Sequence, residues 1–130
     1  MPIESARVEY SAGSTVMKSF ISKPEKAKYA YPGLLVFPEW WGLTDYLELR
    51  TKQLAELGYV AMAVDMYGEG KIASDPAEAG SLMNGVLSKM EDGEARVLAA
   101  MDFLKSQPEV DANRLGCLLY TSDAADDRSC

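Results

Sequence analysis

The chain has 130 residues, a length that accommodates one domain and not two. Its composition, 48% hydrophobic and 25% charged residues, is typical of a folded domain and excludes disordered, collagen-like and coiled-coil chains. A formal charge of -7 leaves no broad positive surface for a phosphate backbone, so nucleic acid is not expected as a partner. The chain contains no histidine, which excludes a complete Ser-His-Asp or Cys-His-Asp triad within it.

Cysteine usage and the N-terminal segment indicate the compartment. The two cysteines, Cys117 and Cys130, are too few for a disulfide framework or a thiolate zinc site. Residues 1–7 contain no basic segment followed by an apolar run, and no stretch approaches the length of a membrane span. We therefore expect a cytoplasmic protein without a membrane partner.

The first third of the chain predicts three strands. Residues 7–22 alternate β-branched, aromatic and small side chains around a turn at 11–14, a pattern typical of two short antiparallel strands. The lysine-rich segment 23–31 predicts a polar connection on the surface. Residues 33–37 form a continuous apolar run, which indicates a strand buried on both faces of a parallel sheet.

A β-α-β unit follows. The spacing of Asp45 and Glu48 predicts a helix that begins near Thr44 or Asp45 and ends just before Gly58. Its expected apolar face contains Leu47, Leu54 and Leu57. Residues 59–64 predict a second buried strand, which completes the unit.

The remainder predicts two helices and a further strand. Asp75 and Pro76 open a helix that reaches about Lys89, and a second helix covers residues 92–106. The apolar face of the second helix is expected to contain Val97, Leu98, Met101 and Leu104. Residues 115–120 predict another parallel strand. The order of elements therefore predicts an α/β fold, with a mainly parallel sheet, an N-terminal antiparallel strand pair and helices on both faces.

The loop after the first buried strand is the first candidate site, because ligands bind at the carboxyl ends of strands in such sheets. An apolar cleft at Glu39 would raise the pKa of its carboxyl and let it assist a nucleophile, while the amide of Trp40 would face a developing oxyanion. Alternatively, Glu39 lies at a helix N-terminus and both Trp40 and Trp41 pack on the sheet edge. Composition alone favours this second, structural interpretation.

The loop 65–70 is the second candidate site, where Tyr67 is expected to form a pocket wall. Asp65 either binds a ribose hydroxyl or holds the loop through hydrogen bonds, and the missing Gly-x-Gly-x-x-Gly pattern favours the second interpretation. No cofactor is expected. We interpret the acidic residues near the C-terminus as solvated charges and not as a metal site. They are Asp123, Asp126 and Asp127.

Four blocks of sequence stand in a specific order: 33–43 (GLLVFPEWWGL), 54–61 (LAELGYVA), 64–68 (VDMYG), and 107–111 (QPEVD) before 114–116 (RLG). Together they resemble the dienelactone hydrolase family of α/β-hydrolases. The resemblance covers residues 1–116 and implies the N-terminal part of an α/β-hydrolase fold. It further implies that the full-length parent hydrolyses carboxylic esters or lactones, as a carboxymethylenebutenolidase does, through an acyl-enzyme and a Cys-His-Asp triad.

The resemblance also implies roles for individual residues. Glu39 occupies the position of a glutamate that takes part in activating the cysteine, and the amide of Trp40 occupies that of an oxyanion-hole donor. Trp41 and Tyr67 are the expected substrate-binding residues. Glu69 stands where members that act on dienelactone carry an arginine for the substrate carboxylate, which puts that particular substrate in doubt.

The segment after Gly116 departs from the family pattern. Ser122 lacks the flanking glycines of a nucleophile elbow, so we do not assign it as a nucleophile. Residues 117–126 resemble the translation of a transposase-library sequencing adapter, which makes 117–130 a non-native tail and both cysteines part of it. The competing interpretation is a genuine buried strand followed by an acidic tail.

Three hypotheses follow for function. The first is the N-terminal half of a dienelactone-hydrolase-like enzyme, inactive by itself because the nucleophile and histidine are missing. The second is a non-catalytic module that binds a small apolar ligand near Trp40 and Trp41. The third is an interaction protein that pairs through the open edge of its last strand. The oligomeric state is not predicted.

Overall fold

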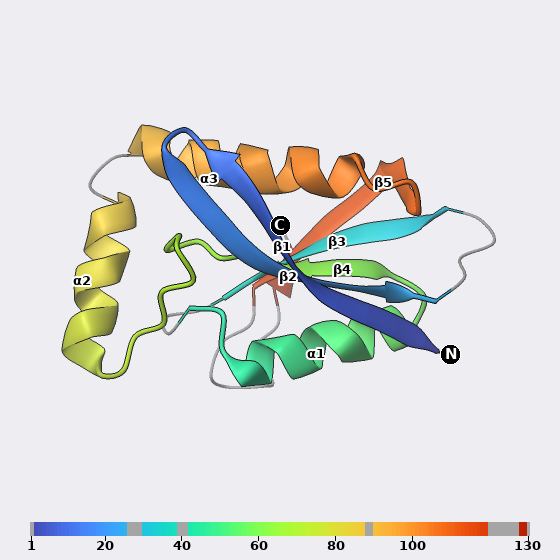
Figure 1. Cartoon of the computed structure of the whole chain (residues 1–130), viewed down its shortest axis with the longest axis horizontal. Helices are drawn as coiled ribbons and strands as arrows, with labels where there is room; N and C mark the ends of the chain where they lie inside the picture. Colours follow the sequence, from blue (N-terminus) through green and yellow to red (C-terminus); the bar gives the residue numbers. More distant parts are fainter. Residues whose placement is uncertain (1, 26–29, 39–41, 88–89, 120–127, 130) are drawn as a thin grey trace.

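A computed structural model describes residues 2–25, 30–38, 42–87, 90–119 and 128–129. They form one six-stranded sheet, with the strand order β1-β2-β4-β3-β5-β6 and helices on both of its faces (Figure 1). The strands are β1 (Ile3–Ala12), β2 (Thr15–Pro24), β3 (Tyr31–Phe37), β4 (Val60–Ala63), β5 (Val110–Leu119) and β6 (Arg128–Ser129). The helices are α1 (Asp45–Glu56), α2 (Pro76–Leu87) and α3 (Met90–Lys105).

The N-terminal hairpin is confirmed and is longer than predicted. β1 and β2 pair antiparallel over ten residues each, from Ile3 opposite Pro24 to Ala12 opposite Thr15. The interpretation of Lys23 and Pro24 as a surface connection is therefore wrong. Pro24 is fully buried at the end of β2, a position where its missing N–H is tolerated, and Lys23 is held by an ion pair with Glu109.

The predicted parallel core is confirmed. β3 pairs in parallel with β4 on one side and β5 on the other, so its apolar run is buried between two neighbours. β5 begins at Val110, earlier than predicted. Residues 112–114 bulge out between Asp111 and Leu115, and this polar bulge separates the start of the strand from its apolar run in the sequence. Asp111 holds this polar bulge by accepting hydrogen bonds from the amide of Asn113 (3.0 Å) and from Nε of Arg114 (2.8 Å).

α1 covers one face of the sheet (Figure 1). Thr44 caps its N-terminus, and its hydroxyl accepts a 3.4 Å hydrogen bond from the amide of Leu47. Leu47 packs with Phe20 and Val36 in the core on this face. The prediction for Leu57 is wrong, because the helix ends at Glu56 and the capping Leu57 is 75% exposed.

The remaining helices follow the sequence with one correction. The carboxylate of Asp75 accepts a hydrogen bond from the amide of Glu78, which confirms the predicted cap of α2. α3 lies on the opposite face from α1 and buries Ala100 and Leu104 (Figure 1). Leu98 is 49% exposed, contrary to prediction, because each helical residue turns by about 100° and position 98 lies away from the face centred on 100 and 104.

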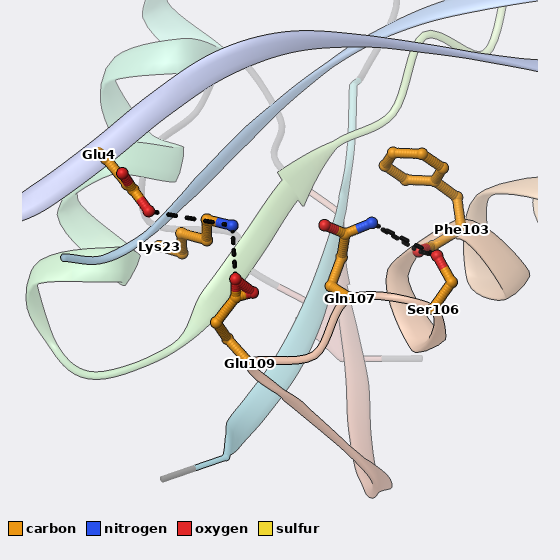
Figure 2. A network of polar contacts seen from close by, with 6 residues as sticks. All are labelled: Glu4, Lys23, Phe103, Ser106, Gln107 and Glu109. Atoms are coloured by element: carbon orange, nitrogen blue, oxygen red, sulfur yellow. Dashed lines mark hydrogen bonds and ion pairs between the residues drawn. The ribbon is translucent and has the colours of Figure 1, made fainter. Parts of the chain in front are cut away.

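Polar contacts close the end of the sheet where β3 begins. Nζ of Lys23 lies 2.7 Å from Oε1 of Glu109 and 3.9 Å from Oε1 of Glu4 (Figure 2). In the same view, the side-chain amide of Gln107 donates to the carbonyl oxygen of Phe103 at the end of α3. These contacts join β1, β2 and the start of β5.

The end of the chain folds back onto the sheet. β6 pairs antiparallel with β5 at Leu118 and Leu119, and Cys117 is disulfide-bonded, which the cysteine count did not predict. The predicted boundary after Gly116 falls within β5, which continues to Leu119. Among the described helices, none combines the length and the apolar character needed to cross a membrane.

Candidate functional site

The candidate site lies where three neighbouring strands end. Val36 on β3 pairs with Ala63 on β4 and with Leu118 on β5, and Phe37 pairs with Leu119. Neighbouring strands lie about 4.8 Å apart, so the ends of β3, β4 and β5 lie side by side at the carboxyl edge of the sheet.

Several predicted site residues fall outside the described part of the chain. These are Glu39, Trp40 and Trp41; the residues not assigned to a site, Ser122, Asp123, Asp126 and Asp127, also lie outside it. Among the described residues, no group of three or more acidic, cysteine or histidine side chains is arranged to hold a metal ion. The described site therefore consists of the ends of the loop after β3 and the whole loop after β4.

The loops after β3 and β4 touch at Gly42. A Cβ atom at this residue would lie 2.8 Å from the carbonyl oxygen of Lys71 and 3.3 Å from Cδ2 of Tyr67. Gly42 also has a φ of +93°, so both its backbone conformation and its surroundings require glycine. The structure thus brings the two loops together that the sequence identified separately.

Asp65 organises the loop after β4 and is 1% exposed. Its carboxylate accepts hydrogen bonds from the backbone amides of Lys18 (2.9 Å), Gly68 (3.1 Å) and Gly70 (2.7 Å). Its own amide donates to the hydroxyl of Ser19 (3.0 Å). This arrangement confirms the interpretation that Asp65 holds the loop, because both carboxylate oxygen atoms serve backbone amides and not a ligand hydroxyl.

Tyr67 lies within the organised loop and is 7% exposed. Burial raises the pKa of its hydroxyl above the ordinary value of 10.0, so the group stays neutral at physiological pH and keeps its donor proton. Its ring contacts the Gly42 turn. The structure therefore places Tyr67 at the junction of the two loops.

Arg96 is a residue of this site that sequence reasoning missed. From the second turn of α3, its Nη1 atom donates hydrogen bonds to the carbonyl oxygen atoms of Met66 (2.8 Å) and Tyr67 (3.2 Å). The sequence holds no signal for these contacts, because the acceptors are backbone atoms and any residue type supplies them.

Glu69 closes the loop against the hairpin. Its amide donates to the carbonyl oxygen of Val16 (2.7 Å), and its carboxylate accepts a hydrogen bond from the amide of Val16 (3.3 Å). The residue has a φ of +56°, in the left-handed region, and its side chain is exposed. The loop thus carries a negative charge at position 69, on its solvent side.

An apolar pocket lies on the α3 side of the sheet. It has a volume of about 190 Å³ and is lined by Leu35, Met101, Leu104, Leu115, Gly116 and Cys117. These residues supply no charged group for acid-base chemistry. The pocket is therefore separate in character from the polar junction around Asp65 and Tyr67.

Comparisons with known proteins identify relatives over most of the chain. Protein usf of Aquifex pyrophilus is 37% identical in an alignment of 103 residues that covers 75% of this chain. An Aquifex aeolicus (strain VF5) protein whose name proposes it as a carboxymethylenebutenolidase is 38% identical over 103 residues. The chain spans 42% of the length of each of these two relatives.

Solved structures agree with the fold. The chain superposes on a structure named m3DLH with a TM-score of 0.86 and 34% identity. It superposes on a dienelactone-hydrolase-like promiscuous phosphotriesterase from metagenomic libraries with a TM-score of 0.84 and 32% identity. Each match covers 91% of this chain and 49% of the other. The structure is thus part of an α/β-hydrolase fold.

A family model agrees with these relatives. The model of the dienelactone hydrolase family matches residues 17–120, which include the hairpin strand β2, the β-α-β unit and β5. The chain therefore belongs to the dienelactone hydrolase family.

Proposed function

We propose that the full-length parent of this chain hydrolyses a small carboxylic ester or lactone through an acyl-enzyme intermediate. The observation that carries the proposal is the parallel pairing of β3 with β5 through Leu34 and Gly116, residues that precede the adapter-like tail, which places the carboxyl ends of the two strands next to each other. A nucleophile supplied after β5 in the parent would then lie beside the segment that contains Glu39. Family membership supports the reaction class.

In this proposal the chain supplies the surroundings of the reaction and not its nucleophile. Glu39 activates the cysteine of a Cys-His-Asp triad, and the amide of Trp40 donates a hydrogen bond to the oxyanion. Trp41 and the neutral hydroxyl and buried ring of Tyr67 contact the substrate. The 130 residues contain no histidine, so we propose that the chain by itself is inactive. We also propose a cytoplasmic location for the parent, since the disulfide-bonded Cys117 belongs to the adapter-like tail and not to the parent.

A phosphotriester is a second candidate substrate. Position 69 holds a glutamate, which repels a substrate carboxylate, so uncharged substrates fit this loop better than anionic lactones. The similarity to a structure named as a promiscuous phosphotriesterase supports the same choice. An ester, a lactone and a phosphotriester therefore belong in one substrate panel.

The test uses a full-length homologue that retains Glu39 and carries the nucleophile. Glu39→Gln should lower the rate of acylation, measured as the burst of 4-nitrophenol from 4-nitrophenyl acetate in stopped flow. Gln has nearly the same size but cannot accept a proton, so the comparison isolates the charge. An unchanged burst rate would remove Glu39 from the mechanism.

The alternative function is a non-catalytic module that binds a small apolar ligand or another chain. The apolar pocket lined by Leu35, Met101 and Leu115 supports this alternative. Saturable quenching of tryptophan fluorescence by an aromatic lactone without turnover would favour ligand binding. Concentration-dependent sedimentation would favour association through a sheet edge.

A further inference from the structure

The loop 65–70 is held by charged side chains on its donor side, at backbone N–H groups, and on its acceptor side, at backbone carbonyl oxygen atoms. The carboxylate of Asp65 accepts hydrogen bonds from the backbone amides of Gly68 (3.1 Å) and Gly70 (2.7 Å). Arg96 donates hydrogen bonds to the backbone carbonyl oxygen atoms of Met66 (2.8 Å) and Tyr67 (3.2 Å). Hydrogen bonds to ionised groups are stronger than neutral ones, so both sides of the loop are fixed firmly.

The two sides meet in one peptide group. The carbonyl oxygen of Tyr67 accepts from Arg96, and the N–H of the same peptide bond, on Gly68, donates to Asp65. A peptide group is planar, so hydrogen bonds to its oxygen and from its N–H restrain the rotation of the whole plane. The peptide on the other side of Tyr67 is restrained as well, because its oxygen, on Met66, also accepts from Arg96, so both backbone dihedrals of Tyr67 and the direction of its side chain are restrained.

We call the hydrogen bonds of Arg96 and Asp65 to these two peptide groups the peptide clamp, and the clamp restrains Tyr67. The ring is 7% exposed and contacts the Gly42 turn, where the loop after β3 returns to α1. Arg96 is half-buried, and its Nη1 atom carries two N–H groups, enough for one hydrogen bond to each of the two neighbouring carbonyl oxygen atoms. α3 is thereby linked to the loop 65–70 by the side chain of Arg96.

We propose that Arg96 is a positioning residue: together with Asp65 it fixes the Tyr67–Gly68 peptide plane and so holds Tyr67 in the orientation that the substrate pocket requires. The reference to a substrate pocket rests on the proposed function. The peptide clamp itself does not, because it is defined by contacts within this chain.

The first test measures amide hydrogen exchange by NMR in the ¹⁵N-labelled 130-residue chain. Arg96→Gln should speed exchange at Gly68 and Gly70 by about tenfold, the effect of losing a hydrogen-bond contribution of about 1.4 kcal/mol to local stability. Arg96→Lys, which keeps a charged donor, should retain part of the protection. The amide of Val64, which bonds to the carbonyl oxygen of Val36 in the sheet, should not change.

Arg114→Gln is the matched control. Nη2 of Arg114 also donates to a backbone carbonyl oxygen, that of Ala30 (3.1 Å), and Ala30 directly precedes β3 at the opposite edge of the sheet. This variant should leave exchange at Gly68 and Gly70 unchanged. Unchanged exchange in Arg96→Gln, or an equal increase at Val64, would overturn the proposal, since the second result would mean general destabilisation.

The second test measures binding of dihydrocoumarin, an aromatic lactone, by tryptophan fluorescence. Arg96→Gln should raise the Kd several-fold, Arg96→Lys should restore part of the affinity, and Arg114→Gln should have no effect. An unchanged Kd in Arg96→Gln would overturn the role of Arg96 in substrate positioning. If the unmodified chain does not bind dihydrocoumarin, the exchange data alone decide the clamp, and the burst assay in the full-length homologue decides the proposed function.

Discussion

The carboxylate of Asp65 accepts a 2.9 Å hydrogen bond from the backbone amide of Lys18, and this contact joins the loop after β4 to the middle of β2. The amide of Lys18 is one of three backbone amides that donate hydrogen bonds to the two carboxylate oxygen atoms of Asp65. The pairing of β2 with β4 ends at Phe20 and Ala63, and beyond it the buried carboxylate of Asp65 accepts the hydrogen bond of the Lys18 amide.

Replacement of Asp65 should destabilise the protein strongly. Asp65→Ala leaves three amides without their acceptor and should lower the free energy of unfolding by about 3 kcal/mol. Asp65→Asn keeps one acceptor oxygen and should cost less. Urea unfolding followed by tryptophan fluorescence measures both. Asp75→Ala, which removes the exposed cap of α2, is the control and should cost about 1 kcal/mol; equal losses at the two sites would contradict this account.

Gly68→Ala should destabilise the loop through two separable effects. The added Cβ would lie 2.4 Å from Cγ2 of Thr15, and the φ of +81° disfavours any L side chain. We expect a loss of about 2–3 kcal/mol in the free energy of unfolding. Adding Thr15→Ser removes the clashing methyl group and should recover the steric part, leaving about 1–2 kcal/mol of backbone strain.

Gly80→Ala provides the control for this substitution. Gly80 lies in α2 with no heavy atom within 4 Å of an added Cβ. Alanine favours helix over glycine, so this variant should gain about 0.5–1 kcal/mol. A loss at Gly80 comparable to that at Gly68 would show that the assigned cause is wrong.

Tyr10 should make stability depend on pH above 10. Burial raises its pKa from 10.0 to about 12, which outweighs the opposing effect of the 2.9 Å hydrogen bond to Ser19. The folded state therefore keeps the proton over a range in which the unfolded chain has lost it. The resulting stabilisation is fully present below pH 10 and is lost as pH rises towards 12.

Tyr10→Phe tests this dependence. Urea unfolding between pH 9 and 12 should show a steeper decline for the unmodified chain than for Tyr10→Phe. Tyr46→Phe, at a side chain that is 47% exposed, serves as the control. Parallel curves for the unmodified chain and Tyr10→Phe would refute the assignment.

The purified chain should not hydrolyse 4-nitrophenyl acetate above the rate of the same chain unfolded in urea, corrected for the effect of urea on the spontaneous reaction. It has no histidine to transfer the proton, and exposed lysines react slowly in either state. Release of 4-nitrophenol is followed by absorbance. Turnover that requires the folded chain would show that the chain contains a complete catalytic centre of its own.

The sequence predicted the elements whose pattern is local. The apolar run at 33–37 and the cap at Asp75 were sufficient, because burial on both faces and a capping side chain leave direct traces in the residue order. The predicted places of Leu57 and Leu98 on the apolar faces of their helices were wrong. Leu57 lies just past the end of α1, and Leu98 lies on α3 away from its buried face, two details that periodicity does not resolve. The early start of β5 was missed because its polar bulge at 112–114 hides the strand.

The site was only partly predictable for a different reason. Asp65 was interpreted correctly, since an aspartate before a glycine-rich loop commonly binds nearby amides. Arg96 was not recognised, because its partners are backbone oxygen atoms about thirty residues away, a contact that depends on how α3 lies across the sheet. Glu39, Trp40 and Trp41 stay predictions.

The ion pair between Lys23 and Glu109 has a consequence for biosynthesis. Its partners are 86 positions apart, and Tyr10 likewise stacks on Phe103, so the part of the hairpin that contacts α3 is covered much later than the part that pairs with β4. A ribosome adds about 5–20 residues per second, so this part of the hairpin stays uncovered for on the order of ten seconds during synthesis. A nascent chain therefore completes this contact only after α3 has been synthesised.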